Sequence, residues 1–183
     1  MHKFKMQSDP AYSAQINALD AQVLNIVQNQ GAANKLATQV YTIPVVVHVI
    51  HVGEPLGTGS NVTDASIQNM IASLNSSFAN ANGNGVDIQI QFCLASRDPN
   101  GNATTGIRRV DGNVYAGYNP NGVYSYPGCG GISDAPIKAA NGWNKDYYYN
   151  IYIVINICGA SGYAELPYNS GTKDGMVINY SAI

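Results

Sequence analysis

This sequence of 183 residues has little charge, few histidines and no long apolar run. Charged residues make up 11% of it and the formal net charge is -2, which leaves no basic face of the kind that binds nucleic acid. No apolar run approaches the ~20 residues that a membrane-spanning helix needs. The first ten residues carry basic side chains without a following apolar core, so they do not resemble a signal peptide. The sequence therefore argues against nucleic-acid binding and against a membrane protein.

The residues that are present are typical of a folded, exported protein. Hydrophobic residues make up 45% of the chain, and its length allows one domain of ordinary size with a core. Nineteen glycines and thirteen tyrosines indicate β structure with many turns. Polarity comes mainly from Asn, Ser, Gln and Tyr side chains, because charged residues are scarce.

The three cysteines are an odd number, which in an exported protein suggests one disulfide and one free thiol. Cys129 and Cys158 both lie beside glycines in loop-like contexts, so we predict that they pair. Cys93 lies within an apolar strand, and we expect it to be a small buried hydrophobe. A metal site built on cysteine is not favoured, because the chain has neither C-x-x-C nor a neighbouring Cys/His pair.

Hydrophobic periodicity predicts helices and strands along most of the chain. Residues 11–30 show helical spacing, and Thr63 or Asp64 would cap a second helix that ends near Phe78. Residues 109–144 are expected to be irregular, with a short helix near 134–140. The predicted strands are 43–51, buried on both faces, 86–95, half-buried, 147–157, buried, 162–166, a short edge strand, and 176–180, an inner strand.

Five groups of segments, in this order and spacing, resemble the amino-terminal half of the pappalysin-type metzincins, which are secreted zinc endopeptidases. The groups are IPVVVHVI at 43–50; VTDASI at 62–67 with LNSSF at 74–78; IQFCLA at 90–95 with Asp98-Pro99 and GIR at 106–108; YNIYIV at 149–154; and GYAELP at 162–167 with DGMVI at 174–178.

This resemblance implies an α/β (α+β) fold, the upper subdomain of a metzincin-like domain. We expect a twisted mixed sheet of about five strands, with an antiparallel edge strand and helices packed on it. Residues 1–40 would be a propeptide-like helix and linker, and residues 41–183 a truncated catalytic domain. By the same resemblance, the full-length protein would be secreted and would hydrolyse peptide bonds with a zinc-activated water.

The residues that would hold zinc in such a family are absent from this chain. The family binds zinc through H-E-x-x-H, in which two histidines one helical turn apart reach the same ion. The histidines here are His2, His48 and His51, and no such motif occurs. His48 and His51 lie three apart on a strand, so their side chains should point to opposite faces and cannot share a metal. We therefore predict no catalytic residue, no metal ligand and no cofactor for this chain alone, which should be inactive.

The segment Gly162, Tyr163, Ala164 and Glu165 is the best candidate for a functional site in this chain. An edge strand exposes backbone N–H and C=O groups to which an extended peptide can add as a further strand. The resemblance implies that this segment borders the substrate cleft, so the expected partner is a peptide or protein substrate. Glu165 is expected to be a solvated side chain. The alternative function is a non-catalytic module that binds peptides through the same edge.

Three other features are expected to be structural. Residues 98–102 and 80–87 are rich in oxygen ligands but lack the spaced carboxylates of a calcium loop, so turn chemistry explains them better. Arg108 should pair with a carboxylate or with carbonyl groups. A Cys93/His48 dyad is disfavoured, because burial and the absence of an orienting acid would leave the thiol inert.

Overall fold

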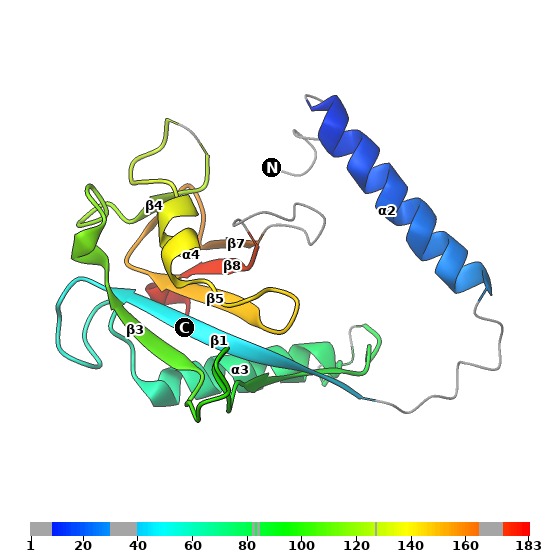
Figure 1. Cartoon of the computed structure of the whole chain (residues 1–183), viewed down its shortest axis with the longest axis horizontal. Coiled ribbons are helices and arrows are strands. Elements are labelled where there is room, and N and C mark those ends of the chain that lie inside the picture. Colours follow the sequence, from blue (N-terminus) through cyan, green and yellow to red (C-terminus); the bar gives the residue numbers. More distant parts are fainter. Residues whose placement is uncertain (1–8, 30–39, 82, 84, 127, 165–173) are drawn as a thin grey trace. The chain divides into compact units, whose positions relative to one another are not determined.

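The computed structural model describes residues 9–29, 40–81, 83, 85–126, 128–164 and 174–183. The chain forms two compact units, Met1–Gln39 and Val40–Ile183 (Figure 1). Among the described residues, no helix has the length and apolar character needed to cross a membrane.

The first unit contains one long helix, α2 (Pro10–Asn29), close to the range predicted from its periodicity. The Asp9 carboxylate accepts a hydrogen bond from the Tyr12 N–H at 3.0 Å, which satisfies one of the free N–H groups of the first turn. Ile16 is buried, whereas Val23 and Leu24 are about half exposed, at 49% and 58%. Gln30, at which the predicted helical range ends, lies outside the described residues.

The second unit is organised around β1 (Tyr41–His51), whose central valines have no exposed surface. β-branched side chains favour such an extended, fully buried strand. One side of β1 pairs in parallel with β5 (Tyr149–Val154). The other side pairs in parallel first with β2 (Ile90–Leu94) and then with β3 (Ile107–Asp111). The central strand is thus long enough to hold two short neighbours end to end on one edge.

The sheet continues beyond β5 to β8 (Met176–Asn179), which is parallel, and ends at β7 (Gly162–Ala164), which is antiparallel to β8. The strand order is β2-β1-β5-β8-β7, with β3 also on β1. A separate two-stranded sheet joins β4 (Val123–Tyr124) and β6 (Ile157–Cys158). The antiparallel edge strand is therefore the last member of a mixed sheet, as predicted.

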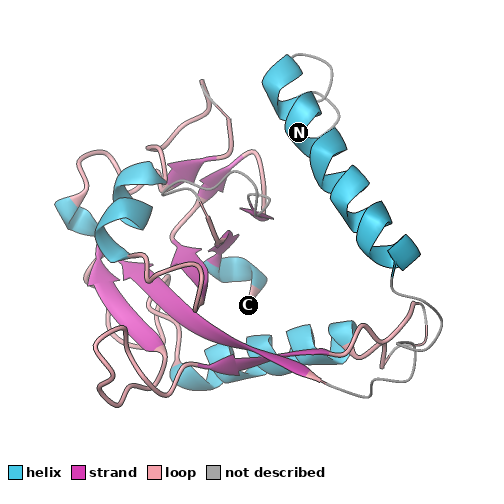
Figure 2. Ribbon diagram, turned by 45° about the vertical axis from the view of Figure 1, so that its right-hand side comes forward, coloured by secondary structure: helices cyan, strands magenta, loops and turns pink. Residues whose placement is uncertain are grey.

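Helices cover both faces of the sheet (Figures 1 and 2). α3 (Asp64–Phe78) begins at Thr63, whose Oγ1 accepts a hydrogen bond from the Ser66 N–H at 3.1 Å. Its Ile67 and Ile71 pack with Val45, Val47 and Ile151. On the opposite face, Ile137 of α4 (Ala135–Asn141) packs in a cluster with Tyr152 and Val177. Short 3₁₀ turns follow β3 (Gly112–Val114) and β8 (Tyr180–Ala182).

Three predictions about the strands need correction. β3 was not anticipated, because two adjacent arginines hide its alternation; it is the sixth strand of the main sheet in the described part of the chain. β2 begins at Ile90 and not at Val86, since Gln89 has a φ of +58° that interrupts the extended backbone. Cys93 is exposed instead of buried, because it alternates with the buried Phe92 and points to the other face.

Candidate functional site

The strand β7 lies at the edge of the sheet, and its burial alternates along its three residues. Gly162 and Ala164 are exposed, whereas Tyr163 is half-buried and packs against the cluster that contains Ile137 of α4. The register pairs Tyr163 with Val177, which has no exposed surface. The tyrosine therefore lies on the α4 face of the sheet, and Gly162 and Ala164 lie on the other face.

The hydrogen-bond register determines which backbone groups of β7 face outward. The Asn179 N–H donates to the Ser161 carbonyl at 2.9 Å, so these two residues form a hydrogen-bonded pair. Such pairs alternate along an antiparallel ladder, which makes Tyr163 and Val177 the next one. The N–H and C=O groups of Gly162 and Ala164 then point away from β8, toward the side of β7 on which no described strand pairs. An extended peptide that adds to this edge would bond to those two residues.

Three of the four residues predicted for the site lie on β7. Gly162, Tyr163 and Ala164 are brought together on the edge strand, as the sequence predicts. Glu165 lies outside the described residues.

A disulfide joins Cys129 to Cys158, the last residue of β6, a few residues before the edge strand. This is the pairing that the sequence predicts. Ser125 reinforces it, because its N–H and its Oγ both donate to the Cys158 carbonyl, at 3.2 and 2.8 Å. The loop before α4 is therefore tied to the segment that leads into β7.

α4 carries a buried cation that sequence reasoning missed. The Lys138 side chain is 1% exposed, and its Nζ lies 2.9 Å from Oδ2 of Asp134. The same nitrogen lies 5.8 Å from the ring centroids of both Tyr152 and Tyr163. Burial raises the pKa of Tyr152, and the carboxylates of Asp134 and Asp174 raise it further. The sequence does carry a signal for this ion pair, because Asp134 and Lys138 lie four residues apart at the predicted short helix.

His48 is a core residue. Its Nε2 lies 3.0 Å from Oδ1 of Asn150, and the imidazole has no exposed surface. The amide of Asn150 is oriented by Trp143, whose N–H donates to Oδ1 and whose carbonyl accepts from Nδ2. Because Oδ1 is an acceptor, Nε2 of His48 must carry the proton. Its Nδ1 has no hydrogen-bond partner among the described residues.

The described residues do not fit a zinc site. No group of three or more His, Cys, Asp or Glu side chains in this part of the chain is arranged to hold a metal ion. His51 is half-buried near the end of β1, and its Nδ1 accepts a hydrogen bond from the Gly53 N–H at 3.1 Å. Burial lowers the pKa of His48 to about 4. Because the described residues offer no set of metal ligands, they supply no catalytic step at a metal.

The remaining candidates have structural roles, as expected. The Asp98 carboxylate accepts from the backbone N–H groups of Asn100 and Asn102, and Asn80 bonds in both directions with the backbone of Gly85. These oxygen atoms therefore close turns. Arg108 donates to the Asn141 carbonyl at the end of α4, at 2.9 Å.

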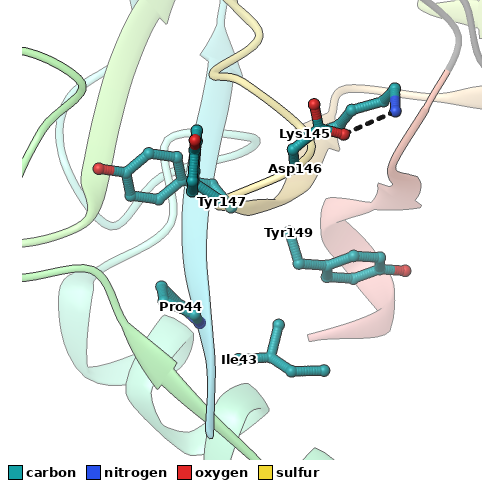
Figure 3. Close-up of a pocket in the computed structure, with 7 residues that line it drawn as sticks. Ile43, Pro44, Lys145, Asp146, Tyr147 and Tyr149 are labelled. Atoms are coloured by element: carbon teal, nitrogen blue, oxygen red, sulfur yellow. Dashed lines mark hydrogen bonds and ion pairs between the residues drawn. The ribbon is translucent and has the colours of Figure 1, made fainter.

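A surface pocket lies at the amino-terminal ends of β1 and β5 (Figure 3). Tyr147 and Pro44 lie on one side of the β1 ribbon, whereas Ile43 and Tyr149 lie on the other. A neighbouring pocket shares Pro44, Tyr147 and Tyr148 and also includes Cys93. Neither of these two pockets is lined by β7, so both are separate from the edge strand.

These observations define a metzincin-like fold, in which a mixed sheet ends in a short antiparallel strand and helices cover its faces. The solved structures that it resembles include those of mirolysin, a metzincin-type metalloprotease. Mirolysin in complex with compound 9 is 29% identical, with a TM-score of 0.55, over 78% of this chain and 53% of that chain. Mature mirolysin of Tannerella forsythia in complex with a cleaved peptide has the same identity and coverage and a TM-score of 0.57.

A promirolysin mutant from the same organism is 25% identical, with a TM-score of 0.64, over 98% of this chain and 57% of that chain. The chain thus spans a little over half the length of these structures, 53% to 57%. No protein-family model matches the sequence, and neither does any curated protein.

Proposed function

We propose that this chain is the amino-terminal part of a secreted zinc metalloendopeptidase of the pappalysin type, and that β7 binds the peptide substrate by strand addition. The observation that carries the proposal is the geometry of the edge. Gly162 and Ala164 turn their backbone groups away from β8 on the antiparallel last strand of a metzincin-like sheet. Backbone pairing of this kind holds a peptide extended, whatever its side chains.

The structural neighbours support a peptide ligand. One of them, mature mirolysin, was solved with a cleaved peptide bound. Our proposal extends that type of ligand to this chain. The role of the residues present is to bind and orient an extended peptide along β7, and not to activate water.

The coverage of the neighbours supports a propeptide at the amino end. The promirolysin structure matches 98% of this chain, whereas the mature mirolysin structures match 78%. The unit Val40–Ile183 contains 144 of the 183 residues, about 79% of the chain. The part of this chain that promirolysin matches and mature mirolysin does not is therefore about as long as residues 1–39. We propose that these residues are propeptide-like.

Zinc enters the proposal only through residues that would follow Ile183. The ligands and the general base would come from an H-E-x-x-H helix encoded downstream, where the metal would supply the activated water. The first test is the nucleotide sequence beyond codon 183. An open frame with H-E-x-x-H-x-x-G-x-x-H would support the proposal, whereas a stop codon without that motif would contradict it and leave the peptide-binding module as the better account.

The second test addresses the edge strand in the protein extended by that downstream sequence. Ala164→Pro removes the outward N–H, and proline is tolerated on a free strand edge. We expect KM for a quenched fluorescent peptide to rise by about tenfold, because a backbone hydrogen bond to the peptide is lost. Ala164→Val keeps the N–H and is the matched control. Equal KM values for the proline and valine variants would contradict binding along β7.

A further inference from the structure

Lys138 is a charged residue in a buried position. Its side chain is 1% exposed, and its charge is balanced by Asp134, one turn earlier on α4. Burying an ammonium group is costly even when it is paired, and replacing a buried ion pair with apolar residues is often neutral for stability. The position of this lysine therefore calls for a role beyond the stability of α4.

The ammonium group of Lys138 links two strands of the sheet. Its Nζ lies 5.8 Å from the centroid of the Tyr152 ring on the inner strand β5. It lies at the same distance, 5.8 Å, from the Tyr163 ring on the edge strand β7. Both distances are within the range of a cation–π interaction, which is stronger when the cation is shielded from water.

The edge strand needs a side-chain anchor of this kind. β7 has three residues, and among the described strands it pairs only with β8. Gly162 and Ala164 have no side chain large enough to fix the strand against a neighbour. Tyr163 has a large ring, which lies on the α4 face and not on the face that carries Gly162 and Ala164.

We propose that Lys138 is a positioning residue, which holds the edge strand β7 in its peptide-binding position through the ring of Tyr163. The ammonium group acts from the face opposite Gly162 and Ala164, so it supports the strand without contacting the ligand. The consequence for peptide binding rests on the proposed function. The mechanical link between α4 and β7 does not depend on it.

Hydrogen exchange of the Tyr163 amide, followed by NMR in this chain, tests the link without any peptide. This N–H points toward β8 and exchanges when the edge strand opens. Lys138→Met keeps the length of the side chain but removes the charge, and should speed this exchange by about tenfold. Lys145→Met is the matched control, because Lys145 is a more exposed lysine paired with Asp146 and should leave the Tyr163 amide unchanged.

A double-mutant cycle separates this link from a general loss of stability. Tyr163→Leu should speed opening by a similar factor, and adding Lys138→Met to it should have little further effect, because the two residues act through one contact. Amides of β5 should keep their protection in every variant. The proposal is overturned if Lys138→Met leaves the Tyr163 exchange rate unchanged, or if the two effects multiply.

The peptide consequence is measured in the chain extended by its downstream sequence. Lys138→Met should raise KM for a quenched fluorescent peptide by about tenfold, with kcat unchanged, because the strand that binds the peptide must first be ordered. An unchanged KM would overturn the connection to peptide binding. If the wild-type protein cleaves no peptide, the proposed function fails, and the exchange experiment alone decides the role of Lys138.

Discussion

The imidazole of His48 stacks on the ring of Tyr152, with centroids 4.7 Å apart and an interplanar angle of 17°. The two residues are paired in register on β1 and β5, the central strands of the sheet. Asn150 requires Nε2 of His48 to be the donor, and burial lowers the pKa of the imidazole to about 4, so it is neutral near pH 7 in the folded protein. A second proton would go to Nδ1, which has no hydrogen-bond partner among the described residues.

The first prediction is that stability falls in mild acid because of His48. Burial lowers its pKa from 6.5 to about 4, with the Asn150 hydrogen bond opposing the shift and Arg108 adding to it. Between these two pH values the unfolded chain binds the proton and the folded chain does not. This contribution is therefore complete above about pH 6.5 and is lost as the pH falls to about 4, an effect on the order of 3 kcal/mol.

Urea unfolding between pH 4 and pH 7 measures this effect. His48→Gln should flatten the pH dependence of the free energy of unfolding. His51→Gln is the control, because that histidine is only half-buried and bonds locally to Gly53. The same slope in wild type and His48→Gln would show that His48 does not account for it.

The second prediction concerns the disulfide. Cys129 and Cys158 are 29 residues apart, and a loop of that length corresponds to about 3 to 4 kcal/mol of unfolding free energy in the chain-entropy model. The Cys129→Ser/Cys158→Ser double variant should lose this amount in urea unfolding. Adding reductant should then destabilise the wild type but not the double variant. A wild type that is insensitive to reductant would contradict the predicted contribution.

The third prediction is that Cys93 is the thiol that reacts in the folded, oxidised protein. Its side chain is exposed, and the other two cysteines form the disulfide. A maleimide should add one equivalent under native conditions, and Cys93→Ser should add none. Mass spectrometry measures both. Labelling of wild type only after denaturation would mean that the thiol is buried after all.

The fourth prediction concerns the start of β8. Gly175 has a φ of +100°, and a Cβ there would lie 2.5 Å from the Asn150 carbonyl oxygen. Gly175→Ala should therefore destabilise by about 3 kcal/mol, through backbone strain and a backbone clash. Gly101 also has a positive φ of +83°, but no described atom lies within 4 Å of its Cβ position.

Gly101→Ala is thus the matched control for strain without a clash, and should cost about 1 kcal/mol. Thermal or urea unfolding of the two variants gives the comparison. Equal losses would mean that the neighbourhood of Asn150 yields to a new side chain at Gly175.

Local patterns accounted for the elements whose burial is regular. The valines of β1 and the helical spacing of α3 were read correctly, because each presents one periodicity without interruption. β3 escaped detection, since Arg108 and Arg109 reach past the sheet to the Asn141 and Val62 carbonyls, contacts that no local pattern records. The prediction that Cys93 is buried is wrong, because on this half-buried strand it alternates with Phe92 and lies on the exposed face.

Part of the candidate site can be predicted from the local sequence, and part depends on the tertiary structure. The segment 162–166 is short and bounded by glycine and proline, which predicts an edge strand from the local sequence. Which backbone groups face outward depends on the register of β7 against β8. The role proposed for Lys138 depends on distances between side chains of α4, β5 and β7.

The sequence by itself determined the class of fold, the disulfide partners and the absence of an H-E-x-x-H motif from these residues, because each depends on residue type, spacing or order. Only the tertiary structure decided that Gly162 and Ala164 face the free edge, that His48 carries its proton on Nε2, and that Lys138 lies between two tyrosine rings. These features arise where segments far apart in the chain meet. Hydrogen bonds and charge contacts act over a few ångströms in space, regardless of separation along the sequence.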